Sequence, residues 1–131
     1  MKILPDSVVG RRLLGFGVTE EELAATCLFR WDLQPGAAGT FPLSEKRAVI
    51  LAKSRYLPQD REGRLRDGRH VALLRHEFCH VRQLFEWSAL AYLGKHIVAR
   101  IKTRSILARG SDVERPCYAA QYRAEAEYDK A

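Results

Sequence analysis

The chain has 131 residues, of which 47% are hydrophobic and 29% charged, a balance typical of a globular protein. This length suits one hydrophobic core, so we expect a single domain over residues 1–131. The net charge is +6, but the 22 lysines and arginines form no run of five, so we expect no dedicated nucleic-acid site.

Two further features bear on location. The longest helix-like apolar segment, residues 84–107, is interrupted repeatedly by charged residues, so no membrane-spanning helix is expected, and no signal peptide is visible. The three cysteines are odd in number and scattered, so we expect no disulfide framework. A reducing, cytoplasmic setting is therefore expected. The cysteines are Cys27, Cys79 and Cys117.

The N-terminal part contains one clear local signal. Residues 1–18 give no firm prediction, because several glycines weaken any helix there. Thr19 to Glu22, followed by Leu23, is typical of a capping box, in which a threonine and a glutamate each satisfy a backbone N–H of the other. A short helix is expected to begin at this point.

The next region predicts strands. Residues 26–33 are rich in β-branched and aromatic side chains and are predicted to form a strand. Residues 34–39 read Gln-Pro-Gly-Ala-Ala-Gly, which favours a turn or loop. The apolar run at residues 48–52 is the best strand candidate, and residues 57–69 are expected to form a solvated loop.

The rest of the chain is predicted to be helical. A first helix is expected from about His70 to Trp87, with apolar side chains around most of its circumference. A second is expected over residues 89–108, ended by Arg109-Gly110, and a third over residues 113–128.

The first of these helices contains His76-Glu77-Phe78-Cys79-His80. Residues four apart lie on the same helix face, so His76 and His80 can bind one Zn²⁺, while Glu77 lies beside that face and can take a proton from a metal-bound water. The alternative is a pair of ordinary histidines. Buried ionisable groups are costly unless they are paired or bind a metal, which favours the zinc interpretation.

A catalytic zinc usually has three protein ligands and one water, so a third ligand must come from elsewhere. Glu114 is preferred because it lies at the edge of the apolar stripe of the last helix. Glu125 occupies a similar edge position closer to the chain end, where fraying is expected. In a competing interpretation, Ser111 to Glu114 is a capping box and Glu114 bonds only a backbone N–H. The carboxylates considered are Asp112, Glu114, Glu125 and Glu127.

Other residues near the motif have provisional roles. Tyr118 lies one turn beyond Glu114 and is a candidate to hydrogen-bond the oxyanion of a tetrahedral intermediate, with simple packing as the alternative. Tyr92 and Tyr122 are weaker candidates. Gln83 is expected to pack or hydrogen-bond beside the ligands. His70 and His96 are expected at the surface. Cys27 and Cys117 are expected to be small buried apolar residues. Cys79 is expected to point away from the ligand face.

Residues 76–83, His-Glu-Phe-Cys-His-Val-Arg-Gln, resemble the HExxHxxQ motif of small gluzincin-type zinc metallopeptidases. Residues 114–121 are similar to that family's downstream segment, which often reads Glu-x-Glu-Ala-Tyr. Here Pro116 replaces the second glutamate, so only Glu114 can supply a carboxylate from this segment. The resemblance covers residues 48–121. It implies a zincin-like α+β fold, in which a small β-sheet packs beside the active-site helix and is followed by further C-terminal helices.

The sequence therefore predicts a zinc-dependent metallohydrolase, more specifically a peptidase acting on a peptide or protein substrate, with Glu77 as the general base. The alternative is a non-catalytic, metal-stabilised domain that forms one component of a larger assembly. Because the chain is short for a protease with two lobes, a protein partner that completes the cleft is also considered.

Overall fold

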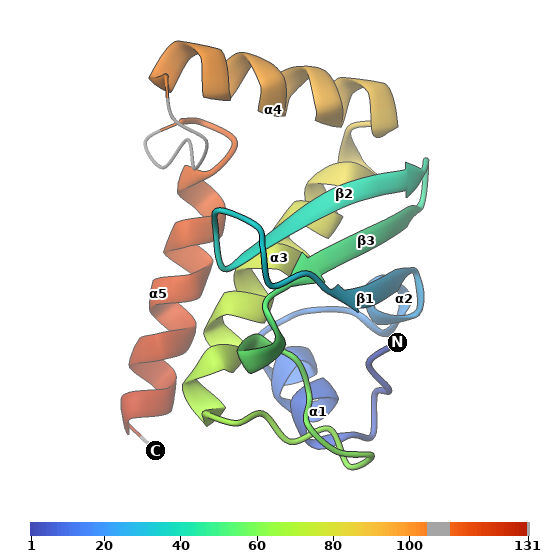
Figure 1. Cartoon of the computed structure of the whole chain (residues 1–131), viewed down its shortest axis with the longest axis vertical. Coiled ribbons are helices and arrows are strands. Elements are labelled where there is room, and N and C mark those ends of the chain that lie inside the picture. Colours follow the sequence, from blue (N-terminus) through green and yellow to red (C-terminus); the bar gives the residue numbers. More distant parts are fainter. Residues whose placement is uncertain (105–110, 131) are drawn as a thin grey trace.

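The computed structural model describes residues 1–104 and 111–130. A three-stranded mixed sheet packs against helix α3, and further helices follow, so the predicted α+β class is confirmed (Figure 1). The elements, in chain order, are α1 (Val8–Gly15), α2 (Glu20–Ala24), β1 (Thr26–Arg30), β2 (Ala38–Ser44), β3 (Arg47–Ala52), the 3₁₀ helices η1 (Ser54–Tyr56) and η2 (Gly68–His70), α3 (Val71–Glu86), α4 (Ala89–Thr103) and α5 (Arg115–Lys130).

The sheet has the order β1-β3-β2. β3 lies in the centre, parallel to β1 and antiparallel to β2. The strands expected at residues 26–33 and 48–52 are present, with the first ending at Arg30. The turn predicted at residues 34–39 is shorter than expected, because β2 begins at Ala38. β2 was not predicted, and it contains Pro42, which an edge strand tolerates because one side of its backbone needs no sheet partner.

Helix α3 is the central element of the core. It was predicted from about His70 to Trp87 and runs from Val71 to Glu86. Its apolar side chains join a buried cluster with residues of α1, α2 and the sheet, so the helix is enclosed on most sides. The buried apolar residues of α3 in this cluster are Val71, Leu74, Phe78, Val81 and Leu84.

The predicted capping box is confirmed and has a tertiary role. The Thr19 hydroxyl accepts a hydrogen bond from the Glu22 backbone N–H at 3.1 Å, and the Glu22 carboxylate accepts one from the Thr19 N–H at 2.8 Å. The same buried carboxylate pairs with Arg82 of α3, with 2.8 Å between Arg82 Nη2 and Glu22 Oε1. A local helix signal thus also anchors α2 to the central helix.

The two C-terminal helices differ slightly from the prediction. α4 begins at Ala89 as expected and ends at Thr103, whereas the predicted end at Arg109-Gly110 lies outside the described residues. α5 runs alongside α3 (Figure 1). Within the described ranges, no helix is both long enough and apolar enough to cross a membrane.

A disulfide joins Cys79 of α3 to Cys117 of α5, with the two Cα atoms 5.3 Å apart. The expectation that the cysteines form no disulfide, and that Cys117 is only a small buried apolar residue, is therefore wrong. α5 packs along α3, so Cys79 meets a cysteine of the neighbouring helix. Cys27 is free and half-buried.

Candidate metal centre

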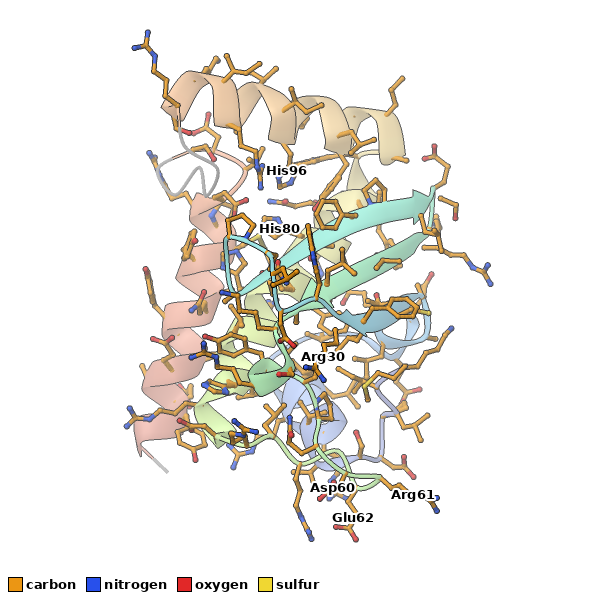
Figure 2. The ribbon with its side chains drawn as sticks, viewed as in Figure 1. Arg30, Asp60, Arg61, Glu62, His80 and His96 are labelled. Carbon is orange, nitrogen blue, oxygen red and sulfur yellow. A yellow bond between two sulfur atoms is a disulfide. The ribbon has the colours of Figure 1, made fainter. Side chains whose placement is uncertain are left out.

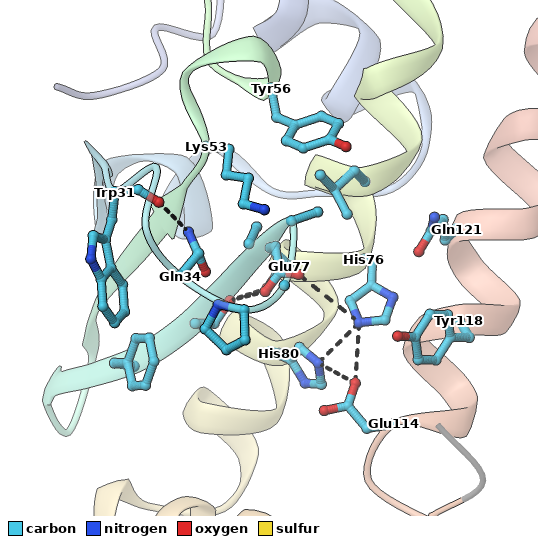
Figure 3. A pocket seen from close by; sticks show the side chains of 18 of the residues that line it. Trp31, Gln34, Lys53, Tyr56, His76, Glu77, His80, Glu114, Tyr118 and Gln121 are labelled. Carbon is cyan, nitrogen blue, oxygen red and sulfur yellow. Dashed lines mark hydrogen bonds and ion pairs between the residues drawn. The ribbon is translucent and has the colours of Figure 1, made fainter. Parts of the chain in front are cut away.

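His76, His80 and Glu114 form one buried cluster that can hold a metal ion (Figure 3). The two histidines lie one turn apart on α3, and Glu114 immediately precedes α5. Glu114 Oε1 lies 3.1 Å from His76 Nε2 and 2.9 Å from His80 Nε2. The two Nε2 atoms are 3.2 Å apart.

These spacings suit a small tetrahedral ion. Ligand atoms about 2.0–2.1 Å from a tetrahedral zinc lie about 3.3 Å from one another. The three observed separations fall just below that value. The donor set, two imidazoles and one carboxylate, is also one that zinc accepts.

The hydrogen-bonding pattern of His80 also favours a cation. Its Nδ1 lies 2.8 Å from Gln83 Oε1, an acceptor, so Nδ1 carries the proton of a neutral ring. Nε2 then presents a lone pair to the Glu114 carboxylate. Two lone pairs facing each other repel, so this geometry requires either a proton on Nε2 or a metal ion between the two groups.

The pKa shifts in this cluster agree with that requirement. Burial alone would raise the pKa of Glu114, but hydrogen bonds from His76 and His80 outweigh burial and hold the pKa of this carboxyl well below its usual range. Burial alone would lower the pKa of His80, but the Glu114 hydrogen bond and the charge of Glu77 raise it overall. Both directions favour a positive charge next to the Glu114 carboxylate, either a proton on His80 or a metal ion in its place.

The structure separates the alternatives for Glu114. Its backbone N–H donates to Ser111 Oγ at 3.3 Å, which is one half of the capping box, while its carboxylate is directed to the histidines. Glu125 does not reach the cluster; it is half-buried on α5 and accepts a hydrogen bond from Gln121 at 3.3 Å. The two other carboxylates considered, Asp112 and Glu127, are exposed.

Glu77 lies beside the three candidate ligands and is held by the sheet. Its carboxylate Oε2 is 4.0 Å from His76 Nε2, and the side chain is buried. The hydroxyl of Thr40 on β2 donates to Glu77 Oε1 at 2.8 Å and also lies 3.2 Å from the Glu77 carbonyl oxygen. Thr40 was missed from the sequence because it belongs to the strand that was not predicted.

Gln83 lies beside the ligands, as predicted. Besides its contact with His80, its amide Nε2 donates to the Val113 carbonyl oxygen at 2.8 Å. Gln83 therefore connects the ring of one candidate ligand to the backbone next to another, Glu114.

His96 was expected at the surface, and this expectation is wrong. It is buried on α4, and its ring centroid lies 4.9 Å from that of His80 (Figure 2). His96 Nδ1 is 3.7 Å from Glu114 Oε2 and 3.2 Å from Arg100 Nη1, while Arg100 Nη2 is 3.6 Å from the same carboxylate oxygen. Burial, followed by the positive charge of His80, lowers the pKa of His96 to about 3. His96 is thus a neutral neighbour of the cluster.

The spacing of α4 could have revealed His96. The buried residues of this helix are Tyr92, His96 and Ala99, which follow the i, i+4, i+7 pattern of one helix face. His70, the other histidine expected at the surface, is half-buried and contacts the Tyr56 ring and the Arg55 carbonyl oxygen.

The three tyrosines occupy different positions. The Tyr118 ring packs against His76, with the centroids 4.3 Å apart, and lines the cleft. Tyr92 is buried and donates to the Thr40 carbonyl oxygen at 3.0 Å. Burial, and then the negative charges of Glu77 and Glu114, raise the pKa of Tyr92. Tyr122 is exposed and stacks on Tyr118.

The cluster opens into a cleft of about 1020 Å³ that runs along α3. At one end, Leu93 and Ile97 of α4 and Phe41 of β2 line it. At the other end it reaches Lys53 and Tyr56, which follow β3. A metal ion in the cluster would therefore lie in the wall of a cleft large enough for a short stretch of peptide.

Comparisons with protein-family models, with curated proteins and with solved structures found no match to this chain. The resemblance to gluzincin-type peptidases therefore rests on the residues of the motif alone, and the fold adds a buried group of residues that could hold a metal ion.

Proposed function

We propose that the protein is a zinc-dependent metallohydrolase of the gluzincin type, with a zincin-like fold, and that it cleaves peptide bonds. The observation that carries the proposal is the convergence of His76, His80 and Glu114 within 3.2 Å of one another, with Glu77 beside them in an open cleft. A zinc ion bound there supplies Lewis-acid polarisation of the substrate carbonyl and lowers the pKa of a bound water to about 7.

The chain's own residues supply the proton transfers. Glu77 takes a proton from the attacking water and later delivers it to the leaving amine. The Thr40 hydroxyl holds the Glu77 carboxylate in one orientation through its 2.8 Å hydrogen bond. Tyr118 lines the cleft next to His76 and hydrogen-bonds the oxyanion of the tetrahedral intermediate.

A second candidate is a non-catalytic, metal-stabilised component of a larger assembly. It is favoured by large apolar side chains that remain exposed on α4 and β2, of which Leu90 is 82% and Leu43 63% exposed. A protein partner that covers these residues would also extend the cleft wall next to Phe41 and Leu93. This partner is compatible with a peptidase, so the two candidates differ only in whether Glu77 performs chemistry.

The cytoplasmic location stays a prediction. The disulfide between Cys79 and Cys117 is more typical of an oxidising compartment, or of a cytoplasmic bond with a redox role.

The test separates metal binding from catalysis. We expect about one zinc per chain in the purified protein, lost in His76→Ala but kept in His70→Ala, a matched histidine outside the cluster. Glu77→Gln should keep both zinc and fold, while peptide hydrolysis falls by about 10²–10⁴. Equal zinc content in wild type and His76→Ala would contradict the site. Zinc binding by a wild type with no hydrolysis of any peptide would favour the non-catalytic candidate.

A further inference from the structure

Lys53 is a cation directed into the cleft. It follows the last residue of β3, and its side chain extends into the cleft on the side of Gln34 and Glu77 (Figure 3). Its backbone is held on both sides, since its N–H donates to the Ala37 carbonyl oxygen at 3.0 Å and its own carbonyl oxygen accepts from the Tyr56 N–H at 3.0 Å. The ammonium group is therefore presented from a fixed base.

Within the part of the chain that the structure describes, no carboxylate lies within ion-pair distance of the Lys53 ammonium. The nearby acidic residues have other partners. Asp32 accepts a hydrogen bond from the Ser54 N–H at 2.7 Å and pairs with Arg30. Asp67 accepts one from the Arg69 N–H at 3.0 Å. Lys53 is half-buried, so its charge has lost part of its hydration without gaining an anion.

The position of Lys53 relative to the metal cluster follows from its neighbours. Tyr56, three residues later, packs against His70 at the start of α3, with ring centroids 4.6 Å apart. His96 of α4 lies at the other end of the cluster, beside Glu114. Lys53 therefore lies on the side of the cluster away from α4. On the α4 side, Leu93 and Ile97 make the cleft apolar.

We propose that Lys53 binds a carboxylate of the substrate, so that the cleft selects peptides with an acidic group on the side of the scissile bond away from α4. The inference rests on the proposed function, because it assigns the substrate class of the same site. The carboxylate is either an Asp or Glu side chain or the C-terminus of the peptide, since both offer the same anion to a lysine. Another cationic side chain that lines the cleft, Arg100, already contacts Glu114 and His96.

The first measurement is peptide binding to zinc-loaded Glu77→Gln, in which turnover is suppressed. Three pools of short peptides are compared by fluorescence anisotropy: blocked peptides with glutamate at a scanned position, the same peptides with glutamine, and glutamine peptides with a free C-terminal carboxylate. We expect one carboxylate pool to bind about 10- to 100-fold more tightly than the neutral pool, as for a charged hydrogen bond. The pool that binds more tightly shows whether the carboxylate is a side chain or the C-terminus of the peptide.

Variants assign this preference to Lys53. Adding Lys53→Met removes the charge and keeps the length of the side chain, so the preference for the carboxylate pool should disappear while binding of the neutral pool is unchanged. Adding Lys53→Glu should reverse the preference toward peptides with lysine. Lys46→Met is the matched control, since Lys46 is an exposed lysine over the Phe85 ring and does not line the cleft. Equal binding of all three pools, or a preference that survives Lys53→Met, would overturn the inference.

Cleavage by the zinc-loaded wild type provides the second measurement. Sequencing the products from a mixed peptide library should show acidic residues, or the peptide C-terminus, enriched on one side of the cleaved bond. Cleavage without this enrichment would contradict the role of Lys53 and leave the proposed function intact. Absence of cleavage together with selective binding would contradict the hydrolase and keep the anion site.

Discussion

The residues of the candidate metal centre, His76, His80 and Glu114, are polar although they are buried. Glu114 is the clearest example, because its two carboxylate oxygens face different neighbours. Oε1 contacts the two histidines of α3, and Oε2 faces His96 and Arg100 of α4. A buried carboxylate with this many nitrogen neighbours is held in one orientation, which is what a metal ligand requires.

This arrangement predicts different outcomes for two glutamates of the C-terminal segment. Glu114→Ala should weaken zinc binding strongly, because it removes the carboxylate that lies within 3.1 Å of both histidines. Glu125→Ala should leave zinc affinity close to that of the wild type, because Glu125 accepts a hydrogen bond from Gln121 and does not belong to the candidate metal group. Zinc titration with a competing chelator measures both. If Glu114→Ala loses only about 0.5–2 kcal/mol of stability and retains its zinc affinity, Glu114 is merely a helix cap.

At the scale of elements, three of the contacts between α3 and the segment that contains Glu114 and α5 restrain the position of Glu114. The disulfide links Cys79 to Cys117, and Gln83 donates to the Val113 carbonyl oxygen at 2.8 Å. The third connection is the contact of the two histidines with Glu114. Cys117 lies three residues after Glu114, so the disulfide limits how far this candidate ligand can move from α3.

Removal of the disulfide should therefore affect both stability and metal binding. It closes a loop with a sequence separation of 38, for which chain entropy gives about 4 kcal/mol, within the range of about 2–5 kcal/mol measured for native disulfides. The double variant Cys79→Ala/Cys117→Ala should lose stability of this order in urea unfolding and bind zinc more weakly. Cys27→Ala, which removes the free cysteine, is the control. Equal unfolding midpoints for the double variant and the wild type would show that the link contributes little.

At the scale of the whole molecule, a bound metal would join the central helix to the C-terminal part of the chain, so the stability of the fold should depend on zinc and on pH together. The pKa of His80 is raised in the folded, metal-free protein. The contribution of His80 to the stability of the fold is therefore fully present at pH values below its pKa in the unfolded chain, about 6.5. This contribution is lost as the pH rises through its pKa in the folded protein. The lowered pKa of Glu114 acts in the opposite direction, with stability present above about 4.3 and lost as pH falls.

Zinc reverses the effect of His80, because its ligands must lose their protons before they bind the metal. We expect the rise in melting temperature on adding zinc to be small at about pH 5.5 and much larger at about pH 7.5, on either side of the unperturbed histidine pKa. Thermal unfolding with and without zinc across this range measures the difference. His76→Ala should show little zinc-dependent rise at either pH. An equal rise at both pH values in the wild type would argue against histidine ligands.

Features that depend on neighbours along the chain were determined by the sequence alone. The spacing of His76 and His80, with Glu77 beside them, follows from the helical repeat once the surrounding apolar pattern predicts a helix. The capping box at Thr19 and Glu22 and the strand predicted at residues 48–52, which the structure has at Arg47–Ala52, are equally local, and all three agree with the structure. Glu114 was predicted as a candidate ligand, but helix-wheel position alone did not separate it from Glu125.

Only the tertiary structure decided which faces of the elements meet. It brings Glu114 rather than Glu125 to the histidines, buries His96 beside them and joins Cys79 to Cys117. It also forms β2 as an edge strand that places Thr40 against Glu77. These contacts link residues far apart in the sequence, and they depend on the packing of α4 and α5 against α3. Local patterns contain the helical repeat and the caps, but they do not contain the rotation of one helix relative to another.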